Sequence, residues 1–94
     1  MTKTEHLLTI GAEECCELAV RFSKAQRFGE EEIQPGQPLT NRLRIIEEFA
    51  DLCGVMKMLG FVVDSPAIQE LALHKIKKVE QFLSYSAVCG RLSQ

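Results

Sequence analysis

The sequence lacks the features that mark several large classes of protein. It contains no run of about 18 apolar residues, so no membrane-spanning segment is predicted and no membrane partner is expected. Its formal net charge is −2 and its few Lys and Arg residues are dispersed, which predicts no strong nonspecific binding to nucleic acid. The first six residues hold a single Lys and lead directly into an amphipathic segment, without the charged and apolar regions of a signal peptide. These absences favour a cytoplasmic location.

Motifs for several kinds of reaction are also missing. The sequence has no GxxxxGK phosphate loop, no GxGxxG and no GxSxG nucleophile motif. Its cysteines, Cys15, Cys16, Cys53 and Cys89, form no CxxC pair. On a helix the adjacent Cys15 and Cys16 would point about 100° apart, which is poor geometry for zinc. We interpret the four as reduced thiols, with Cys15 and Cys53 as small core residues.

The chain that remains is short and helical in pattern. Its 94 residues are predicted to form one domain, residues 1–94. A domain this small buries only on the order of 60 to 65% of its unfolded surface, so help from a second subunit is expected. The predicted fold is all-α, a bundle of three main helices completed by homo-oligomerisation, as a homodimer or a dimer of dimers. The broad apolar surface near the end of the second helix motivates this prediction, through Val55, Met56, Met58 and Leu59.

Apolar periodicity and capping residues place the three helices at about 4–27, 40 or 41 to 59, and 66 to 83 or 85. Gly29 and Gly60 are suited to end the first two, and Ser65 followed by Pro66 is suited to begin the third. A loop of about ten residues, rich in Pro and Gly, is expected over residues 30–39. Residues 61–63 are predicted to be a packed connection rather than a strand. The stripe predicted to face inward on the first helix is Leu8, Gly11, Cys15, Leu18, Phe22 and Ala25, and on the third Ile68, Leu71, Val79 and Phe82.

Two pairs of carboxylates are the most informative feature present. Glu14 and Glu17 lie on the first predicted helix, and Glu48 and Asp51 on the second, each pair with i, i+3 spacing that puts both side chains on one helix face. Packed side by side, the two helices would gather four carboxylates, which is unfavourable without a cation. All-oxygen clusters of this kind suit Mg²⁺ or Mn²⁺. The pattern therefore predicts a metal site and chemistry on phosphates.

Basic residues flank the acids along the same faces. Arg21 and Lys24 follow Glu17 on the first helix, and Arg44 precedes Glu48 on the second. A cation bound to a polyphosphate, with Lys and Arg neutralising the remaining charge, would use such an arrangement. Solvated surface positions or helix ion pairs account for these basic residues equally well.

ExxE on one helix followed by ExxD on the next, in an all-helical chain of this length, resembles the MazG-like nucleoside triphosphate pyrophosphohydrolases. The resemblance extends to residues 13–29, to Thr40 and Asn41, and to residues 75–86, and is strongest to small single-domain members, often encoded by bacteriophages. It implies that Glu14, Glu17, Glu48 and Asp51 bind Mg²⁺, and that a nucleoside triphosphate is cut between its α and β phosphates. The residues expected to bind substrate are Lys24, Arg27, Asn41, Lys75 and Lys78.

Two questions stay open at the level of sequence. The segment between Glu17 and Glu48 is slightly longer than in compact members of that family, which leaves the base and sugar of the nucleotide undefined. Glu13 or Glu47 is a candidate to accept the proton of the attacking water, with helix surface as the alternative for both. A non-catalytic helical module that binds nucleotides or a protein is the competing hypothesis for the whole chain.

Overall fold

The computed structural model describes residues 1–93, which form two compact units. The first unit, Met1–Val62, contains helices α1 (Lys3–Phe28) and α2 (Asn41–Met58), and the second contains helix α3 (Pro66–Val88). No strand occurs among the described residues, so the predicted all-α class is confirmed. The single-domain organisation and the completion of a bundle by a second copy stay predictions.

Each helix begins at a side chain that accepts a backbone hydrogen bond. Thr2 Oγ1 accepts from the Glu5 amide at 3.1 Å, Thr40 Oγ1 from the Leu43 amide at 3.2 Å, and Ser65 Oγ from the Ile68 amide at 3.3 Å. The predicted starts of the second and third helices are confirmed, because this capping chemistry is local in sequence.

The third helix is longer than predicted. It continues to Val88, and the chain leaves it only at Cys89 and Gly90, where Gly90 has a φ of 71°. Residues 84–88 contain no Gly or Pro, so nothing in them prevents the helix from propagating.

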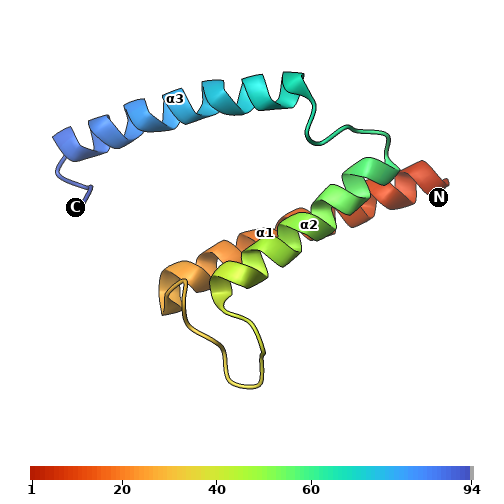
Figure 1. The fold of residues 1–94 in the computed structure, drawn as a ribbon, viewed down its shortest axis with the longest axis horizontal. Helices are drawn as coiled ribbons and strands as arrows, with labels where there is room; N and C mark the ends of the chain where they lie inside the picture. Colours follow the sequence, from red (N-terminus) through yellow and green to blue (C-terminus); the bar gives the residue numbers. More distant parts are fainter. Residues whose placement is uncertain (94) are drawn as a thin grey trace. The chain divides into compact units, whose positions relative to one another are not determined.

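Helices α1 and α2 lie side by side and antiparallel, joined by the loop of residues 29–40 that projects at one end of the hairpin (Figure 1). Hydrogen bonds close the base of this loop. The Asn41 amide donates to Glu32 O at 3.0 Å and the Arg42 amide to Glu30 O at 2.9 Å. The Asn41 side-chain Nδ2 donates to both Gly29 O and Glu32 Oε1, each at 2.9 Å. The loop therefore enters α2 in one defined geometry.

The seam between α1 and α2 changes character along its length. Toward the start of α1 it is apolar: Leu7 is buried, and a Cβ added to Gly11 would lie 3.7 Å from Val55 Cγ1. Toward the loop it is polar, because its buried and half-buried residues there include Glu14, Arg21, Lys24, Asn41, Arg44 and Glu48. Charged groups thus lie where hydrophobic contacts normally hold a helix pair together.

The predicted inward stripe of α1 is partly wrong. Ala25 is buried and Gly11 and Leu18 are half-buried, but Leu8, Cys15 and Phe22 are exposed. Leu7, Glu14 and Arg21 lie on the packed face instead, beside the shared residues, so the true face is rotated by about half a residue, roughly 50°. The assignment of Cys15 to the core is wrong for the same reason. Cys53 is half-buried.

The connection between the units has no strand, as predicted, but it is packed only in part, through the half-buried Val63. Phe61 and Val62 are both exposed. The chain leaves α2 through a turn in which the Phe61 amide donates to Met56 O at 3.0 Å. This backbone contact sets the direction of the chain without burying the two side chains.

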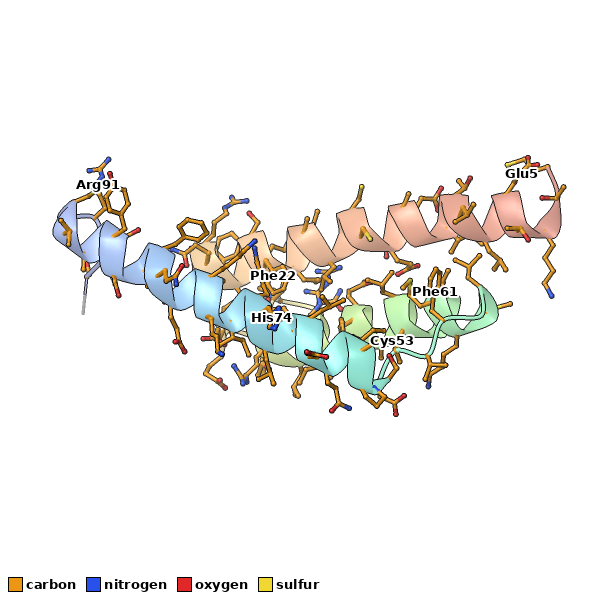
Figure 2. All side chains as sticks on the ribbon, turned by 90° about the horizontal axis from the view of Figure 1, so that it is seen from above. Glu5, Phe22, Cys53, Phe61, His74 and Arg91 are labelled. Atoms are coloured by element: carbon orange, nitrogen blue, oxygen red, sulfur yellow. The ribbon has the colours of Figure 1, made fainter. Side chains whose placement is uncertain are left out.

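Helix α3 is the single helix of the second unit. Side chains project from all sides of it (Figure 2), and within its own unit it buries none of them. The residues predicted to face inward, Ile68, Leu71, Val79 and Phe82, are exposed, because a single helix offers no surface against which to bury them. None of the helices in the described residues is long and apolar enough to cross a membrane.

Candidate functional site

Three carboxylates meet across the α1–α2 seam. Glu14, Glu17 and Glu48 each offer one carboxylate oxygen, and these three oxygens lie within 4.8 Å of one another. Helix α1 supplies two of them because i, i+3 spacing places both on one face, and α2 supplies the third from the facing turn. Glu14 and Glu48 are half-buried, whereas Glu17 is exposed. We refer to these three residues as the acid cluster.

Asp51, the fourth predicted ligand, lies outside the acid cluster. It is exposed on α2, one turn beyond Glu48, and its charge still acts on the Glu48 carboxylate. The structure therefore brings together three of the four predicted acids and leaves the fourth at the edge.

Glu48 has the most perturbed environment of the acid cluster. Burial, which leaves its side chain 15% exposed, is the first cause that raises the pKa of Glu48 above its ordinary value of 4.5. The negative charge of Glu17 raises the pKa further, as do a hydrogen bond with Glu17 and the charges of Glu14 and Asp51. All of these causes disfavour the ionised carboxylate in a chain without a bound cation.

The seam at the acid cluster also contains buried polar atoms without partners. Glu14 Oε2, Glu48 Oε2 and Arg21 Nη1 are buried and make no hydrogen bond. The nearest ionic contact is a long one, 3.9 Å between Arg21 Nε and Glu48 Oε1. Buried polar atoms normally make hydrogen bonds. Carboxylate oxygens and a guanidinium nitrogen that lie in one place without such bonds therefore require an explanation.

A hard divalent cation fits this donor set. Two buried carboxylate oxygens have no donor and a third carboxylate is close by. Burial and the neighbouring negative charges raise the pKa of Glu48, and a cation would offset both of these costs of ionisation. Mg²⁺ binds few carboxylates and keeps several waters, which suits a cluster with one exposed member. The residues present are thus compatible with the metal that the sequence predicts.

Three of the predicted substrate-binding residues line one hollow beside the loop. Lys24, Arg27 and Asn41 border a cavity of about 380 Å³. The Arg27 guanidinium lies 4.9 Å from the centre of the Phe28 ring. The remaining lining residues are Phe28, Glu32, Gln34 and Pro35. Two basic side chains and an aromatic ring at one hollow can bind an anion that carries a planar group.

Asn41 has a structural task at this hollow. It is 2% exposed, and its side-chain amide already donates to two acceptors of the loop. Its predicted contact with substrate is not needed to explain its position. Arg44 similarly supports the loop, because its Nη1 donates to Gln34 Oε1 at 3.0 Å.

The other predicted residues are exposed. Lys75 and Lys78 lie on α3 in the second unit, and Glu13 and Glu47 lie on the outer surfaces of α1 and α2. Their roles stay predictions.

The sequence pattern puts Arg21 on the helix face of Glu17, and the structure adds its contact with Glu48 across the seam. The signal was present, because Arg21 follows Glu17 by four residues and shares its helix face. What the sequence did not provide was the exact rotation of α1, which brings Arg21 close enough to Glu48 to contact it.

Comparisons of the chain with protein-family models, with curated proteins and with solved structures found no match. The resemblance to MazG-like pyrophosphohydrolases therefore rests on the sequence motifs alone.

Proposed function

We propose that this protein hydrolyses a nucleoside or deoxynucleoside triphosphate between its α and β phosphates, in a reaction that depends on Mg²⁺, with Mn²⁺ as an alternative ion. One observation supports the proposal above the others. Glu14 and Glu48 each keep a buried carboxylate oxygen without a hydrogen-bond donor inside a cluster of three acids. Such oxygens are costly unless a cation binds them.

The acidic and the basic residues of the chain would have different roles in this reaction. Glu14, Glu17 and Glu48 would hold the cation, with Asp51 adding negative charge from the edge of the acid cluster. Lys24 and Arg27, at the hollow beside the loop, would bind phosphate oxygens, and Asn41 would hold the loop in place. Glu13 or Glu47 would accept a proton from water. The bound cation supplies charge stabilisation of the phosphate oxygens and lowers the pKa of a coordinated water.

The direct test is to incubate the purified protein with a panel of ribo- and deoxyribonucleoside triphosphates and Mg²⁺, and to identify the products by chromatography. The expected products are a monophosphate and pyrophosphate. Orthophosphate without pyrophosphate would show a different reaction. Glu48→Gln should abolish turnover, whereas Glu80→Gln, an exposed position on α3, should not change it.

The competing function is a helical module that binds nucleotides or a protein without turnover. The contact of Arg21 with Glu48 favours it, because part of the acid cluster's charge is then balanced by the chain itself. Thermal melts and calorimetry separate the two functions. Stabilisation by Mg²⁺ that Glu48→Gln removes supports the enzyme, and binding of a partner with an affinity unchanged by chelator supports the module.

A further inference from the structure

Arg21 occupies an unusual position for an arginine in an ion pair. Its side chain is 21% exposed, its Nη1 is buried without a partner, and its only ionic contact among the described residues is at 3.9 Å. The chain offers a direct contrast in Arg42, whose Nη1 lies 2.7 Å from Glu30 Oε1 although both side chains are more than half exposed. The pair at the surface is tight and the pair in the seam is loose. A guanidinium nitrogen that is buried with unused donors is costly, so the position of Arg21 is poorly explained by helix packing alone.

The place of Arg21 along α1 suggests what its unused donors serve. Glu17, Arg21 and Lys24 succeed one another at about one turn each, so Arg21 lies between the acid cluster and the hollow that Lys24 lines. A phosphate bound to a cation in the acid cluster and extending toward Lys24 would pass Arg21. The guanidinium presents several N–H groups in a planar fork that matches phosphate oxygens.

We propose that Arg21 exchanges partners when the site fills. Without a cation it is the counter-ion of Glu48, and with a cation at the acid cluster its guanidinium turns to a phosphate oxygen of the substrate. A cation and a guanidinium beside the same carboxylate repel each other, which drives the exchange. The proposal rests on the proposed function, and it makes Arg21 both a competitor of the metal and a binding residue for the phosphate chain.

Two titrations test this exchange, because they should move in opposite directions. In calorimetry with Mg²⁺ alone, Arg21→Met should bind Mg²⁺ about tenfold more tightly than the parent, since a nearby positive charge is gone. In a titration with the Mg²⁺ complex of inorganic triphosphate, the same variant should bind about tenfold more weakly or worse, since a charge-assisted hydrogen bond to phosphate is lost. Arg42→Met is the matched control, and it should leave both affinities at the parent values.

The outcomes separate this inference from the function on which it rests. One case is a parent that binds Mg²⁺. If Arg21→Met then binds Mg²⁺ no more tightly than the parent, or binds triphosphate as tightly as the parent, Arg21 forms only a structural ion pair. That result overturns the exchange and leaves the proposed function standing. A parent that binds no Mg²⁺ overturns the proposed function and the exchange with it.

A second variant covers the case in which Arg21→Met does not fold, as judged by circular dichroism. Arg21→Lys keeps the charge and removes the planar fork. The exchange then predicts parent-like Mg²⁺ affinity with weaker triphosphate binding. Parent-like values in both titrations would overturn it.

Discussion

At the scale of single residues, Glu48 is held in the folded chain in conditions that oppose its ionisation. Its carboxylate is largely removed from water, two other glutamates lie within 4.8 Å, and the nearest positive group is 3.9 Å away. Folding therefore places this side chain in a less favourable environment than it has in the unfolded chain. The stability of the metal-free protein should report that difference.

The pH dependence follows from the direction of the pKa shift. The folded state holds the Glu48 proton to higher pH than the unfolded chain, whose value is about 4.5. Above pH 4.5 the folded state binds more protons, so the free energy of unfolding falls as the pH rises toward the raised pKa, and then levels. In chelator at pH 7, the parent should have a lower melting temperature than Glu48→Gln. This difference in melting temperature should disappear near pH 4. A gap that does not change with pH would contradict this account.

Asn41 gives a prediction about the loop. Asn41→Ala removes the donor to Gly29 O and to the Glu32 carboxylate, and leaves Gly29 O with the weaker contact of the Glu32 amide at 3.3 Å. The expected loss is about 1–3 kcal/mol in the free energy of unfolding, measured with urea. The control is Gln69→Ala, which removes an exposed hydrogen bond of the same length, 2.9 Å, from the Gln69 side-chain amide to Asp64 O. It should change the free energy of unfolding by less than about 0.5 kcal/mol. Equal effects of the two variants would show that burial of Asn41 does not matter.

At the scale of helices, the starts of α2 and α3 were predictable, whereas the end of α3 and the packed face of α1 were not. Thr40, Ser65 and Pro66 act within a few residues of themselves, so their capping roles can be read locally. The face of α1 depends on which of two neighbouring stripes meets α2. One stripe holds Leu8, Cys15 and Phe22 and looks more apolar than the stripe with Glu14 and Arg21. Periodicity favours the first stripe, while the structure packs the second against α2.

Two glycines at different places in the hairpin should respond to alanine with opposite signs. Gly29 ends α1 with φ 99° and ψ 146°, a conformation almost restricted to glycine, so Gly29→Ala should cost about 1–3 kcal/mol. Gly54 lies inside α2 with nothing within 4 Å of an added Cβ. Gly54→Ala should stabilise the protein by about 0.5–1 kcal/mol. Urea unfolding of both variants measures the difference, and destabilisation by Gly54→Ala would indicate that another surface covers this part of α2.

At the scale of the whole molecule, the described residues bury few apolar side chains. Leu7 and Ala25 are the buried apolar residues, whereas Phe22, Ile46 and Phe49 on the hairpin are each more than half exposed. Val55 and Met58 were among the residues from which association was predicted. Val55 lies close to Gly11 in the seam and is therefore used within the hairpin, whereas Met58 remains exposed. The better candidates for an interface are Phe22 and Ile46, which border a cavity of about 550 Å³ on the hairpin.

We therefore expect the parent to associate at micromolar concentration, as a dimer or a dimer of dimers, in sedimentation or light scattering. Ile46→Glu should weaken association roughly ten- to a hundredfold, because burying an isoleucine contributes about 1.5–3 kcal/mol. Val62→Glu, at an exposed position in the connection after α2, serves as control and should associate like the parent. A stably folded monomer at all concentrations would remove the oligomeric part of the predicted fold.

The candidate site, like the fold, was predictable from the sequence only in part. The spacing of Glu14, Glu17 and Glu48 was sufficient to predict that they meet, because i, i+3 pairs on two packed helices have few other arrangements. The edge position of Asp51 and the half-buried position of Arg21 depend on the relative rotation of α1 and α2. The structural task of Asn41 depends on the loop, whose path no local pattern in the sequence defines.

The change from a polar to an apolar seam along the hairpin also bears on the order in which the chain folds. Closing a short loop costs less entropy than closing a long one, so contacts near residues 29–40 can form first. The acid cluster joins residues 31 to 34 positions apart and the apolar contact of Gly11 with Val55 joins residues 44 positions apart, so helix pairing that starts at the loop reaches the acid cluster first. The folding barrier then contains the repulsion within the acid cluster, and Glu48→Gln should speed refolding in stopped-flow experiments. Val55→Ala should act mainly by speeding unfolding, because its contact forms after the transition state.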